Sequence, residues 1–211
     1  MLIAIDENDN RVRAIPGRAG RCPVCDTEVI PKCGAIKPWH WAHRTLDTCD
    51  TWSEGETDWH LGWKQFVADI NPNCVERTIT EGGKRHRADI DVPRFGVIEI
   101  QHSSISAAEI IERENFYGRM IWIFDARDAW RKDRLELCTP IRSGGYRGFT
   151  FRWKRGRKTL KYVRRPLWLD LGTTMLRVDD IDETCSGCGH IVEKDDMKRM
   201  IARKIREGCY A

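Results

Sequence analysis

We predict a mixed α+β fold with a metal-binding segment toward each end of the chain. Apolar residues recur at helical spacing after residue 53, which indicates an amphipathic helix. Between residues 86 and 106, apolar and acidic side chains alternate in two short runs, a pattern typical of strands with one buried face. Two Cys-x-x-Cys pairs, one starting at Cys22 and one at Cys185, flank these elements.

The composition favours a globular, intracellular protein. The chain has 211 residues, enough for one core and a small satellite, and its 41% hydrophobic and 32% charged residues are typical of a soluble domain. No apolar stretch approaches membrane-spanning length, and the first ten residues lack the features of a signal peptide. We therefore expect a cytoplasmic protein with no membrane contact. Nine cysteines in a reducing compartment favour metal ligation over disulfides.

The first cysteine group lies in the segment CPVCDTEVIPKCGAIKPWHWAHRTLDTC, residues 22–49. Zinc takes four ligands in a tetrahedron, usually two from each of two short segments. The predicted ligands of a structural zinc ion are Cys22, Cys25, His43 and Cys49. His40 is the alternative to His43, because side chains three residues apart point the same way in a helical turn and oppositely in a strand. The other interpretation is a reduced pair of buried cysteines beside core histidines.

A helix is predicted next, over residues 53–70. Ser53 followed by Glu56 is a capping-box signature for its start. Its apolar stripe contains Trp59, Trp63, Phe66, Val67 and Ile70. A strand near residues 74–80 and a turn at Gly82-Gly83 come after this helix.

The alternating runs predict two strands that face each other across a Pro-Arg-Phe-Gly turn. Their apolar residues, Ala88, Ile90, Val92, Ile98 and Ile100, would form one face. Their polar residues, Asp89, Asp91, Glu99 and Gln101, would form the other. This second face is either a solvated surface, with Arg85 or Arg87 as ionic partners, or a site for a hard metal ion.

A second helix is predicted from a capping box at Ser106 and Glu109 to a stop at Gly118. The run MIWIFD, residues 120–125, then reads as a fully buried strand. The predicted order is helix, three strands, helix, strand. Short strands fill much of residues 146–178.

The second cysteine group is CSGCGH, followed by a helix over residues 195–206. We predict a second zinc knuckle there, with a glycine between its cysteines as zinc knuckles favour. Its predicted ligands are Cys185, Cys188 and Cys209, with Cys138 or His190 as the fourth. Cys33 and Cys74 are expected to be ordinary buried thiols.

Residues 152–165, RWKRGRKTLKYVRR, contain eight basic residues and no acid. Lysine and arginine pair with phosphates and exposed aromatic rings stack on bases, so this stretch is the predicted nucleic-acid surface. The cations are Arg152, Lys154, Arg155, Arg157, Lys158, Lys161, Arg164 and Arg165, and the nearby aromatics are Phe149, Phe151, Trp153 and Tyr162.

These patterns divide the chain into four predicted parts. Residues 1–52 form a zinc-binding segment, and residues 53–130 form the core. Residues 131–180 form a strand-rich basic extension, and residues 181–211 form the C-terminal knuckle and helix.

The order of elements in the core, with Asp89 on its second strand and Glu-x-Gln on its third, resembles the PD-(D/E)XK nuclease fold. More specifically, the chain resembles the competence protein CoiA-like family. The matching stretches, within residues 22–125, are CPVC, HWAH, ETDWHLGWK, RADI, VIEIQHS and ERENFYGRMIWIFD. The family is described as having an N-terminal zinc-binding segment ahead of a restriction-endonuclease-like core. The resemblance implies that Asp89 and Glu99 bind a catalytic Mg²⁺ or Mn²⁺, with Asp91 assisting.

The resemblance also places Gln101 where most members of the superfamily have a lysine. Glutamine can orient the attacking water but supplies no charge, although some restriction-type members also have Glu-x-Gln. His60 and Lys64, on the first helix, could supply the missing proton handling or charge. Arg113 and Tyr117 resemble the Gln-x-x-x-Tyr element of RecB-like nucleases, with arginine replacing glutamine. They are either a phosphate clamp or a solvated arginine beside a core-edge tyrosine.

This interpretation leads to three candidate functions. The first is a metal-dependent DNA nuclease acting in DNA uptake, recombination or phage DNA processing. The second is a non-catalytic nucleic-acid-binding protein on a degenerate nuclease fold. The third is a zinc-ribbon adaptor, which is favoured only if the basic stretch is buried or neutralised.

Overall fold

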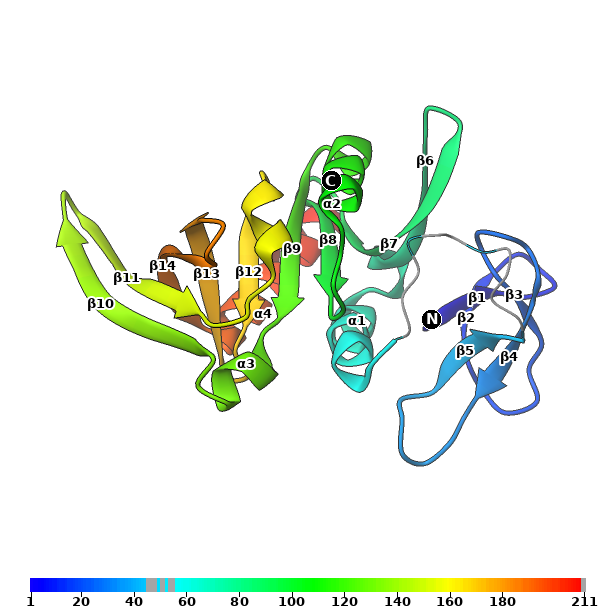
Figure 1. Cartoon of the computed structure of the whole chain (residues 1–211). Helices are drawn as coiled ribbons and strands as arrows, with labels where there is room; N and C mark the ends of the chain where they lie inside the picture. The colour runs from blue at the N-terminus through cyan, green and yellow to red at the C-terminus, as the bar shows by residue number, and fades with distance from the viewer. Residues whose placement is uncertain (45–48, 50–51, 53–55, 210–211) are drawn as a thin grey trace. The chain divides into compact units, whose positions relative to one another are not determined.

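The computed structural model describes residues 1–44, 49, 52 and 56–209, without the side chain of Cys209 (Figure 1). The chain forms two compact units, Met1–Pro93 and Arg94–Ala211, and both mix helices with strands. The predicted α+β class is confirmed at this level, while the finer division into four parts stays a prediction. No helix in the described ranges is long and apolar enough to cross a membrane.

The first unit begins with a five-stranded antiparallel sheet of order β2-β1-β3-β4-β5. Its strands are β1 (Ile3–Ile5), β2 (Arg11–Arg13), β3 (Gly20–Arg21), β4 (Glu28–Lys32) and β5 (His40–His43). Trp41 is 1% exposed, and its indole nitrogen donates to the Val12 carbonyl at 3.1 Å. A Cβ at Gly20 would lie 3.0 Å from both Ala4 and the Trp41 ring, so glycine lets the tryptophan fill this core.

The rest of the first unit comprises α1 (Asp58–Ile70), a short 3₁₀ turn η1 (Pro72–Cys74), β6 (Val75–Glu81) and β7 (Lys84–Val92). The helix begins at Asp58, and Thr57 caps it by accepting from the His60 N–H at 3.3 Å. The predicted helix start is therefore wrong, and Ser53, the first residue of the predicted capping box, lies outside the described residues. Gly82 and Gly83, both at positive φ, join β6 to β7 as predicted.

The second unit is built on a sheet of order β10-β11-β14-β13-β12-β9-β8. β8 (Gly96–Gln101) and β12 (Leu167–Asp170) pair in parallel with β9 (Met120–Asp125), the strand predicted to be buried. The antiparallel strands are β10 (Leu135–Ser143), β11 (Tyr146–Trp153), β13 (Thr174–Ile181) and β14 (Ser186–Glu193). Trp122, Ile123 and Phe124 of β9 are all inaccessible to solvent.

The helical elements of the second unit are α2 (Ala107–Tyr117), α3 (Arg127–Arg131), the 3₁₀ turn η2 (Lys158–Tyr162) and α4 (Lys194–Cys209). The predicted capping box of α2 is present at Ser106 and Glu109, and Gly118 ends the helix at φ 65°. α4 packs on β13 and β14 (Figure 1). The predicted order of helix, three strands, helix and strand is confirmed over residues 58–125.

Candidate metal centre and buried polar clusters

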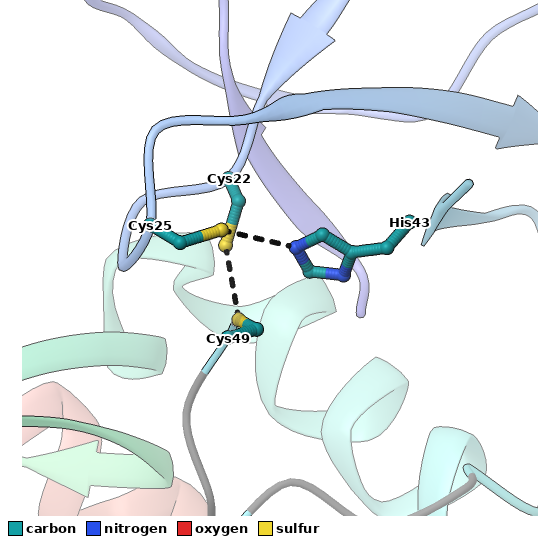
Figure 2. A group of neighbouring side chains, drawn as sticks. All are labelled: Cys22, Cys25, His43 and Cys49. Carbon is teal, nitrogen blue, oxygen red and sulfur yellow. Dashed lines mark hydrogen bonds between the residues drawn. The ribbon is translucent and has the colours of Figure 1, made fainter. Parts of the chain in front are cut away.

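Cys22, Cys25, His43 and Cys49 converge on one point in the first unit, as Figure 2 shows. Their ligand atoms all lie within 4.8 Å of one another, and no other group of metal-ligand side chains this close exists among the described residues. Cys22 Sγ lies 3.7 Å from Cys49 Sγ, and Cys25 Sγ lies 3.4 Å from His43 Nε2. The structure thus brings together the four predicted ligands, which could hold a zinc ion.

These distances match the edges of a zinc tetrahedron. With Zn–S near 2.3 Å and Zn–N near 2.0–2.1 Å, two sulfurs lie about 3.8 Å apart, and a sulfur and a nitrogen lie about 3.6 Å apart. Partial burial opposes ionisation of Cys25, but hydrogen bonds, chiefly with Thr27, outweigh it and hold the pKa of this thiol below its ordinary value. Burial, reinforced by Arg87, lowers the pKa of His43. A thiolate and a neutral imidazole are the forms that bind zinc.

Local backbone structure explains why these residues meet. Cys22 and Cys25 lie in a tight turn in which the Asp26 N–H donates to the Cys22 carbonyl at 2.9 Å, and Asp26 adopts φ 60°. His43 lies on β5, paired with Val29 of β4. Because residues three apart in a strand point to opposite faces, β5 directs His40 away from the cluster. His40 Nδ1 instead lies 2.8 Å from the Pro38 carbonyl, so His43 and not His40 is the candidate ligand.

The second cysteine group does not assemble in this way. A site with Cys185, Cys188 and Cys209, completed by Cys138 or His190, needs at least three described side chains to converge. No such group forms among the described residues. Cys185 is buried and precedes β14, whereas Cys188 lies within β14 and Cys138 is exposed on β10. The predicted second zinc site therefore has no support from this geometry.

The glycines of CSGCGH have a different role from the one predicted. A Cβ at Gly187 would lie 2.0 Å from the Asp180 carbonyl oxygen, and one at Gly189 would lie 2.1 Å from the Arg177 carbonyl oxygen. They permit close approach of β13, whose pairing with β14 shifts register between Val178 and Asp180. Burial raises the pKa of Cys185, which disfavours the thiolate that a metal requires.

A second cluster in the first unit joins α1 to β6 and β7. Lys64 is 1% exposed and forms ion pairs with Glu56, with Glu76 at 2.8 Å and with Asp89 at 3.3 Å. His60 Nε2 lies 3.0 Å from the other carboxylate oxygen of Asp89. Burial alone would lower the pKa of Lys64, but the three carboxylates outweigh it and hold the pKa above its ordinary value. This cluster therefore contains a buried lysine that stays protonated.

Glu76 is a member of this cluster that the sequence pattern did not reveal. It is fully buried, has φ 52° in β6, and accepts from the backbone N–H groups of Leu2 and Ile3 at 2.8 and 3.0 Å. Glu56, which we predicted to cap α1, is an ion-pair partner of Lys64 instead. Buried charges persist where they are paired and hydrogen-bonded, as they are here.

The group formed by Cys22, Cys25, His43 and Cys49, called the zinc-type cluster from here on, contacts β6 and β7 through the turn between Cys22 and Cys25. The Pro23 carbonyl, between Cys22 and Cys25, accepts from Thr78 of β6 at 3.3 Å and from Arg85 of β7 at 3.2 Å. Burial opposes the charge of Arg87, but Glu76 and Glu56, with smaller contributions from Cys22 and Cys49, hold the pKa of Arg87 above its ordinary value. Arg87 is thus electrostatically linked to both clusters.

Two of the predicted acid-site residues, Glu99 and Gln101, lie in the second unit. Glu99 and Gln101 of β8 are 4% and 1% exposed, and Arg113 of α2 donates to them at 3.1 and 3.5 Å. β8 is buried on both faces, so the interpretation of Glu99 and Gln101 as a solvated surface is wrong. Arg113, which is 4% exposed, is not the solvated arginine of the alternative interpretation. Tyr117, one turn along α2, packs edge-on against Phe116.

The other two predicted acids, Asp89 and Asp91, lie on β7 in the first unit, where burial alternates as predicted. Ala88, Ile90 and Val92 are fully buried, and Asp89 and Asp91 occupy the other face. Asp91 pairs with Arg77 at 2.9 Å, whereas Asp89 pairs with His60 and Lys64. Asp89 is therefore the acid of this strand that lies beside buried basic partners.

The basic stretch is largely exposed, but burial, backbone contacts and ion pairs limit the role of several of its residues. Phe151 and Trp153 are buried in the core, so they cannot stack on bases. Arg157 donates to the carbonyls of Gln101, His102, Ser103 and Asp125, which makes it a structural residue. Glu136 pairs with Arg152 at 3.2 Å and with Lys154 at 2.5 Å. Within the part of the chain that the structure describes, the exposed members without such pairs are Arg155, Lys158, Lys161, Arg164 and Arg165.

Three of these cations line a cavity of about 340 Å³, together with Arg177 of β13. Lys161, Arg164 and Arg165 come from the predicted stretch, and Asp179 and Asp180 also line the cavity. Glu114 orders this segment by accepting from the backbone N–H groups of Arg164 and Arg165. No sequence pattern indicated Arg177, because it reaches the cavity from a strand that lies outside the basic stretch.

Residues 12–51 match the family model for competence protein CoiA, N-terminal domain. The resemblance to the CoiA-like family is thereby confirmed. The match contains all four residues of the zinc-type cluster, and residues 52–211 lie outside it. No curated protein and no solved structure matches the chain. The CoiA-like match is compatible with a competence-related role.

Proposed function

We propose that this protein is a metal-dependent DNA nuclease on a PD-(D/E)XK core, acting in a competence-related process. The observation that supports it most is the contact of Asp89 with two buried basic groups, Lys64 and His60, from one helix. Buried basic side chains gathered around a single carboxylate are more typical of a catalytic site than of a solvated strand face.

The proposal assigns separate tasks to these residues. The resemblance to the nuclease superfamily implies that Asp89 and Glu99 each supply a carboxylate to a Mg²⁺ or Mn²⁺ ion, which would activate water and neutralise charge on the scissile phosphate. Lys64 supplies the fixed positive charge that Gln101 cannot, and Gln101 orients water. His60 exchanges a proton with Asp89 or with the attacking water.

The test is cleavage of labelled single- and double-stranded DNA by the zinc-loaded protein, with and without added Mg²⁺ or Mn²⁺. Asp89→Asn and Glu99→Gln should each lower the cleavage rate by at least about 10²-fold, since both keep shape and remove a metal-binding charge. Asp69→Asn is the matched control, because this α1 acid is exposed and contacts Arg13 and Gln65 at the surface.

Lys64 is tested with a conservative substitution, since removal of its charge would leave buried carboxylates without a counter-charge. Lys64→Arg keeps the charge but moves it, so we expect a protein that folds and cleaves at least about tenfold more slowly. A wild-type protein that cuts no DNA with either ion, and binds neither ion at Asp89 or Glu99, would overturn the nuclease proposal.

One observation favours the second function, a nucleic-acid-binding protein without catalysis. Arg113 donates to both Glu99 and Gln101, so a cation already neutralises the acid proposed to bind the metal. DNA binding without cleavage would identify this function. The adaptor function is less favoured, because five basic residues of the stretch are exposed without ion pairs among the described residues.

DNA binding by the basic stretch is tested through its salt dependence. Replacing Arg155, Lys158, Lys161 and Arg164 together with alanine should weaken binding and reduce the slope of log K against log salt by about 3 or more, since each phosphate contact releases counterions. Arg157 is not replaced, because it donates hydrogen bonds to the backbone carbonyls of Ser103 and Asp125. Lys132→Ala, on the exposed ion pair with Asp128, is the control.

A further inference from the structure

The loop that joins β4 to β5 exposes large apolar side chains. Residues 33–39 extend past the ends of both strands (Figure 1). Ile36 is 94% exposed and Trp39 is 48% exposed, the first being the most exposed large hydrophobic residue of the described chain. An exposed tryptophan forgoes the stabilisation that burial would give it, so a binding partner is a reasonable physical explanation.

The β5 strand at the base of this hairpin is anchored by buried and clustered side chains, although the loop is exposed. Trp41 is buried in the sheet core, and His43 belongs to the zinc-type cluster. His40, excluded from that cluster, lies 2.8 Å from the Pro38 carbonyl through Nδ1 and so orders the backbone next to Trp39. The hairpin therefore presents Trp39 from a pre-ordered support, which lowers the entropic cost of binding.

Charge identifies the kind of partner. From Val29 to Arg44 the chain contains no aspartate or glutamate. Arg44 pairs with Glu28 at 3.7 Å, whereas no carboxylate of the described residues pairs with Lys32 or Lys37, which are both exposed. Two lysines that have no ion pair among the described residues, beside an exposed indole, match a ligand that carries phosphates and flat aromatic surfaces together.

We infer that the β4–β5 hairpin binds single-stranded nucleic acid, with a base stacked on Trp39 and phosphates paired with Lys32 and Lys37. Ile36 adds apolar contact with the neighbouring base. Unpaired bases offer a free π face, whereas bases within a duplex are already stacked. This binding requires no cleavage, so it stands or fails separately from the nuclease proposal.

The test is fluorescence anisotropy of a labelled single-stranded oligonucleotide and of its blunt duplex, with zinc-loaded protein and no added Mg²⁺ or Mn²⁺. Trp39→Ala should weaken single-strand binding about 5- to 100-fold, the range expected for loss of one base–aromatic stack. Duplex affinity should change less than about twofold, because a duplex exposes no free base face. Trp39→Phe, which keeps a ring, should recover most of the single-strand affinity.

Two further variants complete the design. Trp130→Ala removes a 36% exposed tryptophan from α3 and should leave single-strand affinity unchanged. Replacing Lys32 and Lys37 with alanine should reduce the single-strand salt slope by about 1.4, or about 0.7 for each phosphate contact. Zinc content equal to that of the wild type shows that each variant remains folded around its cluster.

Two results would overturn the inference. One is unchanged single-strand affinity in Trp39→Ala at wild-type zinc content. The other is an equal loss on the single strand and the duplex, which would mean that Trp39 supports a general backbone contact and stacks on no base. Retained binding by Asp89→Asn would show at the same time that hairpin binding is separate from catalysis.

Discussion

The two Cys-x-x-Cys pairs of this chain have the same spacing and different structures. Cys22 and Cys25 share a tight turn, and their thiols meet His43 and Cys49 within ligand distance. Cys185 directly precedes β14 and packs against Gly156, whereas Cys188 lies within β14 and pairs with β11. The shared spacing therefore brings two thiols near one ion only when the backbone turns between them.

The segment after each Cys-x-x-Cys pair determines whether its two thiols can meet further metal ligands. After Cys25 the chain returns along β4, whose neighbour β5 supplies the imidazole, so a second pair of ligands is within reach. After Cys185 the chain enters a strand with neighbours on both sides, β11 and β13.

The strongest effect is expected at the first pair. Cys22→Ser should abolish zinc binding and unfold the first unit, because a structural zinc contributes folding free energy directly, about 10–16 kcal/mol in zinc-finger peptides. Elemental analysis should give one zinc equivalent for the wild type. Limited proteolysis should show rapid cleavage within residues 1–93 of the variant. Two equivalents in the wild type would remove the distinction between the pairs, since the second would then also bind metal.

The elements that were correctly predicted share strong local signals. Alternation identified the faces of β7, and the capping box at Ser106 with the stop at Gly118 identified both ends of α2. The four residues of the first cluster were also recoverable, because a thiol pair followed by histidine and cysteine has few other uses in a reducing compartment. In each case the deciding information lies close together along the chain.

The parts that were missed depend on distant partners. No local pattern distinguishes Glu76 from any strand acid, yet burial beside Lys64 makes it part of a charged cluster. The choice between His43 and His40 depended on whether the segment formed a strand or a turn. The glycines of CSGCGH suggested a knuckle, but the close approach of β13 explains them.

An intermediate effect is expected at the second pair. Cys185→Ser should leave the zinc content unchanged and lower the free energy of unfolding of the second unit by about 1–3 kcal/mol, since it buries a hydroxyl in place of an apolar thiol. Cys138→Ser, at an exposed position, is the control and should change stability by less than about 0.5 kcal/mol. Urea unfolding, monitored by hydrogen exchange of β14 amides, measures the stability change of both variants. Loss of zinc in Cys185→Ser would contradict the packing role.

The weakest effect concerns how each unit responds to acid. Burial opposes ionisation of Asp125 in the second unit, but hydrogen bonds from Arg127 and His102 outweigh it and lower its pKa to about 2. Because the folded pKa is below the ordinary value of 3.8, this carboxylate stabilises the unit above about pH 4, and the contribution is lost as pH falls toward 2.

Asp125→Asn should therefore lower the free energy of unfolding of the second unit by about 1–2 kcal/mol at pH 7, and the difference from the wild type should vanish near pH 2. Hydrogen exchange of β9 amides across this pH range measures the change. The first unit should unfold at a higher pH, because protons compete with zinc for its thiolates. Simultaneous acid unfolding of both units would mean that the thiol cluster does not set the acid stability of the first. A constant difference between Asp125→Asn and the wild type from pH 7 to 2 would show that Asp125 acts through packing and not through its charge.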